Sequence, residues 1–87
     1  MLFLISSAPD TTEFKTAFRT AREMNAQICL LQNSVYASRG LDEKNLFVLQ
    51  DDIRLRGIDD GEVSAEIIDY GRLVDLMIKS DKVIGLF

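Results

Sequence analysis

Short apolar runs alternate with amphipathic segments along this chain, and that alternation predicts the strands and helices of βαβ units in a parallel sheet. The apolar runs have the length of strands and lie at residues 2–5, 27–31, 46–49, 66–68 and 83–86. The second run is almost continuously apolar, as expected of a strand with helices over both of its faces. We therefore expect residues 27–31 to form a central strand.

The segment between the first two strands predicts an amphipathic helix over residues 10–24. Asp10 lies three residues before Glu13, which is the spacing of a capping box at the start of a helix. Apolar positions then recur at i, i+3, i+4 and i+7, the spacing of one buried helical stripe. They are Phe14, Ala17, Phe18 and Ala21.

The other connections predict shorter helices. A helical turn is expected after Asn33 and ends near Arg39, and a brief helix that starts around residues 50–52 closes at Gly57, a residue suited to a left-handed C-terminal position. Residues 58–62 read as an exposed loop. Asp69 is placed to cap a last helix, whose apolar positions are Tyr70, Leu73, Val74 and Met77.

Five strands and about four helices with short connections predict a three-layer α/β/α sandwich built on a mainly parallel sheet. The sequence contains no linker, repeat or low-complexity segment, so we expect a single domain over residues 1–87. A domain of this size buries only about 60 to 65% of the surface of its unfolded chain. Association with a partner would relieve that limit.

Charge and composition narrow the function classes. Fourteen acidic and ten basic side chains give a net charge of −4, which is the wrong sign for direct nucleic acid binding. The N-terminal MLFLIS lacks the basic region of a signal peptide, and no run approaches the ~20 apolar residues of a membrane helix. One cysteine agrees with a reducing compartment. We expect a cytoplasmic protein that contacts neither nucleic acid nor membrane directly.

Polar side chains follow the predicted strands, at the sheet edge where parallel sheets bind ligands. This strand-end polar cluster comprises Ser7, Gln32, Asn33, Asp51 and Tyr70. Helix capping alone explains such residues, because Ser, Asn and Asp supply the acceptors that helix starts need. A ligand site at this edge stays open as an alternative.

Cofactor and metal signals are weak. No glycine-rich phosphate loop occurs in the sequence, so no nucleotide cofactor is expected. The acidic residues near positions 51–62 lack EF-hand spacing and are interspersed with Arg54 and Arg56, which favours a solvated surface. Without histidine and with one cysteine, no zinc site is expected. We therefore predict neither a metal nor a cofactor.

Cys29 is the one cysteine of the sequence, and its thiol is the candidate nucleophile. It falls in the middle of the predicted central strand, where desolvation would raise its pKa and block attack. A buried free cysteine behaves as a small apolar side chain. The favoured interpretation is a core thiol, and the alternative is a sulfur carrier that uses Cys29.

Three blocks of sequence stand in a characteristic order: LLQNSVYA at residues 30–37, LQDDIRLRG at 49–57 and IIDYGRLVDL at 67–76. They resemble the DsrH/TusB family of small sulfur-relay proteins, with its Leu-Leu-Gln-Asp-Gly-Val, its acidic helix ending in Ala-Arg-Gly and its Asp-Tyr-x-x-Phe-Val-x-Leu. Asn33-Ser34, Leu55 and Leu73 depart from that pattern. The helix over residues 10–24 also lacks the cysteine that some members carry there.

The resemblance implies a DsrEFH-like fold and a subunit of a cytoplasmic complex of three related small α/β proteins. That complex passes persulfide sulfur toward 2-thiouridine at the tRNA wobble position or acts in sulfur oxidation, and the sister subunits generally carry the acceptor cysteine. The expected partners are homologous subunits of the DsrE/DsrF or TusC/TusD type, or a second copy of the chain. This subunit would be non-catalytic, with interface candidates Val35, Tyr36, Leu86 and Phe87. A stand-alone homo-oligomeric module that binds a small ligand is the alternative.

Overall fold

The computed structural model describes residues 1–39, 41 and 44–86. Its five strands are β1 (Leu2–Ile5), β2 (Gln27–Leu30), β3 (Leu46–Leu49), β4 (Glu66–Ile68) and β5 (Val83–Leu86). The helices are α1 (Thr12–Glu23), α2 (Gln50–Leu55) and α3 (Tyr70–Lys79), with 3-10 helices η1 (Gln32–Ser38) and η2 (Asp60–Glu62). The interface candidate Phe87 lies outside the described residues.

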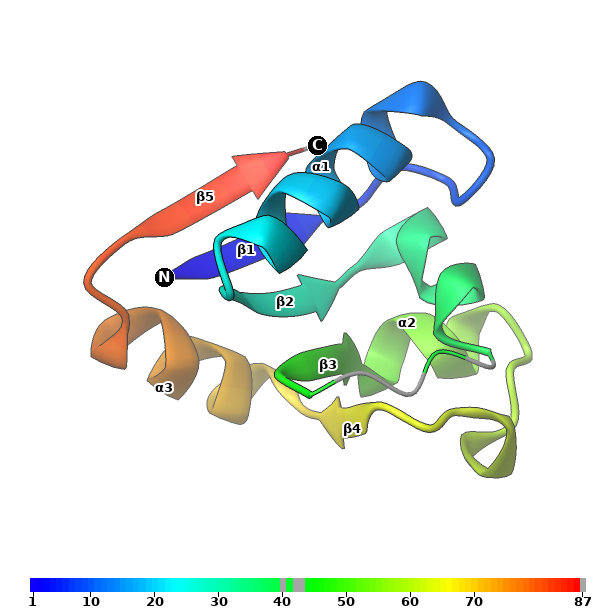
Figure 1. Cartoon of the computed structure of the whole chain (residues 1–87). Helices are drawn as coiled ribbons and strands as arrows, with labels where there is room; N and C mark the ends of the chain where they lie inside the picture. The colour runs from blue at the N-terminus through cyan, green and yellow to red at the C-terminus, as the bar shows by residue number, and fades with distance from the viewer. Residues whose placement is uncertain (40, 42–43, 87) are drawn as a thin grey trace.

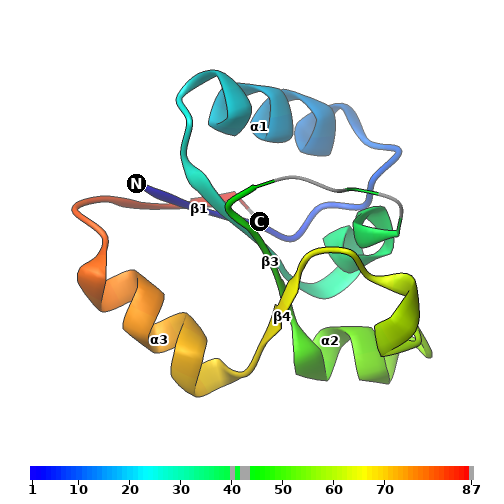
Figure 2. The same cartoon turned by 60° about the horizontal axis from the view of Figure 1, so that its bottom comes forward.

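All five strands pair in parallel in one sheet of order β4-β3-β2-β1-β5, so the predicted α/β fold is confirmed and β2 is central. The strands β1 to β4 are laid down outward from β1, and α3 then carries the chain back across the sheet to place β5 beside β1. Helix α1 covers one face and α3 the other, which gives the three predicted layers (Figures 1 and 2).

Each face of the sheet has its own apolar core, because successive side chains of a strand point to opposite faces. On the α1 face, Phe3, Ile28 and Val48 pack with the inner stripe of α1 and with Ile53 of α2. On the α3 face, strand residues including Cys29 pack against Leu73. The sheet is therefore buried on both sides over its central strands.

Two helix starts show how the local sequence sets the elements. Thr11 is the N-cap of α1, and its Oγ1 accepts a hydrogen bond from the Phe14 N–H at 3.1 Å. The cap was predicted at Asp10, one residue too early. Asp69 caps α3 as predicted, with Oδ1 accepting from the Arg72 N–H at 2.8 Å.

The segment 58–62 was predicted as an exposed loop; residues 59–62 are exposed, and Ile58 is the exception. Ile58 is only 3% exposed and packs in the core of the α1 face, and residues 60–62 form η2. An apolar residue next to Gly57, whose φ is 70°, can turn back into the core because glycine adopts the left-handed region without strain. The 58–62 segment is thus an anchored connection.

Candidate functional site

Cys29 lies on β2 with no exposed surface, paired in register with Leu4 on one side and Phe47 on the other. Burial, together with a smaller contribution from the negative charge of Asp52, raises the pKa of its thiol from 9.0 to about 12. Because the thiolate is the nucleophile, a buried thiol of this kind is inert. The geometry therefore agrees with the core-thiol interpretation.

A network of polar contacts closes the carboxyl end of β2. We call its members, Gln32, Asn33, Ser34, Asp52 and Arg56, the β2-end cluster. Gln32 has a left-handed φ of 51°, and its N–H donates to Asp52 Oδ2 at 2.8 Å. Asn33 Oδ1 accepts from Arg56 Nε at 3.3 Å and Nη2 at 3.2 Å. Arg56 Nη1 also lies 3.4 Å from Asp52 Oδ1.

Ser34 is the buried member of this cluster. Its hydroxyl accepts the Leu31 N–H at 2.9 Å and lies within hydrogen-bond distance of the carbonyl oxygens of Leu31 and Ile5, to one of which it donates. Ser38 is also fully buried and donates to the Val35 carbonyl oxygen at 2.6 Å. The two hydroxyls hydrogen-bond to backbone atoms of the same chain, so they hold this end of β2 in place.

The predicted strand-end polar cluster is only partly brought together. Gln32 and Asn33 are exposed and belong to the β2-end cluster through Asp52 and Arg56, two residues that the sequence analysis assigned to a charged surface and left out of the strand-end polar cluster. Asp51 is exposed in the first turn of α2, beside the carboxylate that makes the contacts. Asp52 and Arg56 are bonded to residues twenty or more positions away, and local sequence carries no signal for such a pair.

The other two strand-end residues, Ser7 and Tyr70, lie elsewhere. Tyr70 is 56% exposed at the start of α3. Ser7 lines a groove of about 760 Å³ between α1 and β5, which none of the other four residues lines. The five residues therefore do not share this groove, and a ligand site built from all of them stays a prediction.

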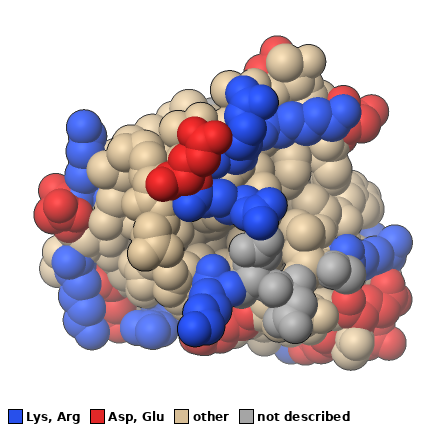
Figure 3. Space-filling view, viewed as in Figure 1, with Lys and Arg blue, Asp and Glu red and all other residues tan. Residues whose placement is uncertain are grey.

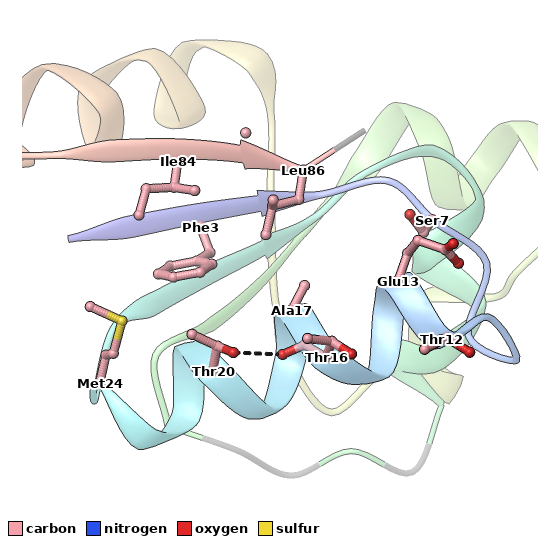
Figure 4. A pocket seen from close by; sticks show the side chains of 11 residues that line it. Phe3, Ser7, Thr12, Glu13, Thr16, Ala17, Thr20, Met24, Ile84 and Leu86 are labelled. Carbon is pink, nitrogen blue, oxygen red and sulfur yellow. Dashed lines mark hydrogen bonds between the residues drawn. The ribbon is translucent and has the colours of Figure 1, made fainter.

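The groove beside Ser7, hereafter the α1–β5 groove, has an apolar floor and a helical wall. Phe3, Ile84 and Leu86 form the floor, and the floor lies opposite α1, as Figure 4 shows. The wall comprises Thr12, Glu13, Thr16, Ala17, Thr20 and Met24, all on α1 or at its end. In Figure 3, charged side chains gather over α1, whereas the surface toward β5 is mostly formed by uncharged residues, drawn in tan. The exposed surface of the groove is mostly apolar, although hydroxyl side chains and Glu13 lie along its wall, so the groove has the character of a packing surface.

The interface candidates have different outcomes. Val35 is fully buried in the core of the α1 face, so its side chain is unavailable to a partner and that prediction is wrong. Tyr36, the next residue in η1, is 44% exposed. Leu86 is half-buried and lines the α1–β5 groove. Tyr36 and Leu86 stay candidates.

Two absences hold for the described residues 1–39, 41 and 44–86. Over these residues, no helix has both the length and the apolar character needed to cross a bilayer. Within the same residues, no three His, Cys, Asp or Glu side chains are grouped as a metal ion would require.

Comparison with known proteins identifies the family of this chain. Residues 6–83 match the family model described as DsrH like protein. The chain belongs to the DsrH-like family. This confirms the resemblance found in the three sequence blocks, and membership implies a subunit of a sulfur relay. No curated protein matches the chain.

A solved structure shares the DsrH-like fold seen here. The solution NMR structure of protein Tm0979 from Thermotoga maritima is similar with a TM-score of 0.68 and 22% sequence identity. The match covers 94% of this chain and 97% of that one. At this identity the likeness concerns the fold, which it reproduces over nearly the whole chain.

Proposed function

We propose that this chain is a non-catalytic subunit of a cytoplasmic sulfur-relay complex that serves 2-thiolation of the tRNA wobble uridine. Its partners would be homologous small α/β subunits that carry the acceptor cysteine. The observation that supports the non-catalytic role most directly is the burial of Cys29, the one cysteine of the sequence. Family membership supports the relay itself.

The chemistry of persulfide transfer explains why burial matters. An acceptor thiolate attacks the outer sulfur of a donor persulfide, a new S–S bond forms and the donor leaves as a thiolate. With a pKa of about 12, only about one Cys29 thiol in 10⁵ is ionised at pH 7. The side chain is also enclosed between its neighbours on β1 and β3. Sulfur would therefore pass through cysteines of the sister subunits.

The acidic charge supports the same division of roles. A net charge of −4 opposes binding to a phosphate backbone, so a different chain of the complex would hold the tRNA. This subunit then contributes surface for assembly. It requires no cofactor or metal for that role.

A first test combines affinity purification with thiol chemistry. The tagged chain, isolated from its native cells, is expected to bring down two small cysteine-bearing relatives in an assembly of defined mass. In the purified chain, Cys29 is expected to resist a thiol reagent until denaturant is added. Rapid modification of the native chain would instead favour the carrier alternative.

A second test separates the tRNA branch from sulfur oxidation. Deletion of the gene is expected to lower 2-thiouridine in total tRNA, and a Cys29→Ala chain is expected to restore it fully. Unchanged 2-thiouridine together with impaired sulfur oxidation would move the chain to the other branch. Failure of Cys29→Ala to restore thiolation, with the chain present at normal level, would contradict the non-catalytic role.

A further inference from the structure

Strand β5 is an open edge of the sheet. It pairs with β1 alone, and among the described residues no strand lies on its other side (Figure 1). The carbonyl oxygens of Lys82 and Leu86 accept main-chain hydrogen bonds from β1 at 2.9 and 3.1 Å, so the even-numbered positions of β5 bond inward. Because alternate residues of a strand direct their main-chain groups to the same side, the N–H and C=O groups of Val83 and Gly85 point away from the sheet.

The opposite edge of the sheet is protected in ways that β5 is not. Natural sheets blunt their edges with charged side chains, proline or very short strands. Strand β4 has three residues, begins with the exposed charge of Glu66 and is followed at once by Asp69, which caps α3. Strand β5 has four residues, with the sequence VIGL, and contains neither a charge nor a proline. The outward main-chain groups of β5 are therefore accessible to a second backbone.

Gly85 and the α1–β5 groove indicate which kind of backbone this edge accepts. Gly85 is exposed and has no side chain to hold another backbone away. On the α1 face, Ile84 and Leu86 are only half-buried and line the groove (Figure 4). An added strand would lie about 4.8 Å beyond β5 and direct every second side chain toward that face, next to these two residues. Main-chain hydrogen bonds would then give affinity, and the apolar flank would select the side chains.

We propose that β5 is a site of β-strand addition, at which an extended segment of a partner protein pairs with the main-chain groups of Val83 and Gly85. The segment that fits is uncharged and carries apolar side chains at alternate positions. An extended backbone matches this edge because its own N–H and C=O groups repeat every two residues, about 6.6 Å at 3.3 Å per residue. A helix bonds its main chain internally and offers no such row. The proposal is independent of the sulfur chemistry.

The first experiment uses synthetic peptides as the probe. An acetylated peptide of alternating isoleucine and threonine, with a lysine at each end for solubility, is titrated into the wild-type chain and followed by NMR. Binding is expected to saturate and to slow hydrogen exchange at the Val83 and Gly85 amides. The Ile84 amide, which faces β1, is expected to change little.

Two methylated peptides are the matched controls for main-chain pairing. One carries N-methyl groups on its isoleucines and the other on its threonines, so both keep the same side chains. Each set of N–H groups lies on one side of the extended peptide. One control is therefore expected to bind about tenfold or more weakly, because it has lost the donors that face β5, and the other is expected to bind like the unmodified peptide.

A pair of protein variants tests the same contact from the side of β5. Gly85→Pro removes the outward N–H, and an edge strand tolerates proline where its nitrogen faces solvent, so the circular dichroism spectrum is expected to be kept. Peptide binding is expected to weaken about tenfold or more. Gly85→Ala keeps the N–H and is expected to bind like wild type. If Gly85→Pro fails to fold, the two methylated peptides decide the question on the wild-type chain.

Three outcomes would overturn the proposal. The absence of any saturable change up to millimolar peptide would show that the edge does not recruit an extended segment. Methylated peptides that behave alike, both binding or both failing, would show that main-chain pairing is not what holds the peptide. Val83 and Gly85 amides already protected without peptide, in an assembly larger than the 9.8 kDa chain, would show that a second copy occupies the edge.

Discussion

The carboxyl end of β2 and the outer side of β5 are completed in different ways. At β2, the side chains of Asn33, Ser34, Asp52 and Arg56 hydrogen-bond to one another or to backbone, and Ser34 is fully buried. At β5, the strand's inward side chains stay half-buried and face the groove beside α1. The chain closes the first region by itself and leaves the second open.

This difference follows from the order in which the strands are placed. Strands β1 to β4 receive a connection after each strand, and η1 and α2 fold back over the end of the sheet and contact each other. The connection that leads to β5 is α3, and α3 packs on the opposite face of the sheet. Ile84 and Leu86 on β5 are consequently only partly buried, whereas the large apolar side chains that are exposed on the last helix, Tyr70, Val74, Met77 and Ile78, belong to α3.

The comparison separates two kinds of side chain that look alike in sequence. A polar residue after a strand suggests a ligand site, yet at β2 such residues hold the fold together. An apolar residue on a strand suggests core, yet on β5 such residues are available to a partner. In this subunit we therefore expect the apolar residues on β5, rather than the polar residues after β2, to contact a partner.

The largest expected effect concerns the closed region. Ile53 of α2 is fully buried in the core of the α1 face, whereas Leu55 on the same helix is 81% exposed. Ile53→Ala is expected to lower the free energy of unfolding by about 2–5 kcal/mol, because it removes buried methyl groups and leaves a cavity. Leu55→Ala is expected to change it by less than about 0.5 kcal/mol. Urea denaturation of both variants would measure the contrast, and equal losses would contradict the assigned burial.

The next effect tests the hydrogen bonds of Ser34 at the carboxyl end of β2. Ser34→Ala removes a hydroxyl that accepts the Leu31 N–H and donates to a buried carbonyl oxygen. The expected loss is about 1–3 kcal/mol, since it leaves buried polar groups unpaired. Ser64→Ala, at an exposed position, is the control and should lie within about 0.5 kcal/mol of wild type. If Ser34→Ala matched its control, the cluster would be dispensable for stability.

A third effect depends on pH through Cys29. Its pKa is about 12 in the folded protein against 9.0 ordinarily, so above pH 9 the unfolded chain loses a proton that the folded chain keeps. Stability from this thiol is therefore complete below pH 9 and falls as pH rises toward 12. The expected loss at pH 10 is about 1.4 kcal/mol.

Cys29→Ala isolates this term from the other groups that titrate at high pH. The variant is expected to be less stable at pH 7 because of the lost packing, and to lose less stability than wild type between pH 8 and 10. Denaturant titrations at each pH would measure the difference. Parallel losses in the two proteins would mean that the thiol is exposed enough to ionise in the folded state.

The strands were predictable because apolar runs that end at polar residues are a local signal. The predicted bounds differ from the observed ones only at β2, which ends at Leu30. The cap of α1 was misplaced because Asp10 and Thr11 are both cap formers, and it is Thr11 whose side chain bonds Ala8 and Phe14. Local patterns locate an element more easily than they choose between adjacent caps.

The candidate site was less predictable because its contacts are not local. Asp52 meets Gln32 and Arg56 meets Asn33 across twenty and twenty-three positions. The family resemblance was readable from three blocks, because those blocks contain the turn after β2 and the starts of α2 and α3. The groove carried no sequence signal, since Ile84 and Leu86 look like any strand residues. Their exposure is set by the helix that returns on the other face.

The smallest expected effect compares two isoleucines on the same face of the sheet. Ile28 on β2 is 3% exposed beneath α1, and Ile84 on β5 is half-buried in the groove floor. Ile28→Val is expected to cost about 0.5–1.5 kcal/mol, as a buried methyl does, whereas Ile84→Val should cost less than about 0.5 kcal/mol in dilute protein. If an added strand covers the flank of Ile84, the cost of Ile84→Val should rise when the alternating peptide is present while that of Ile28→Val stays constant, because binding stabilises only the folded chain. Thermal unfolding with and without the peptide would measure both. A peptide-independent cost at Ile84 equal to that at Ile28 would show that β5 is already closed within one chain.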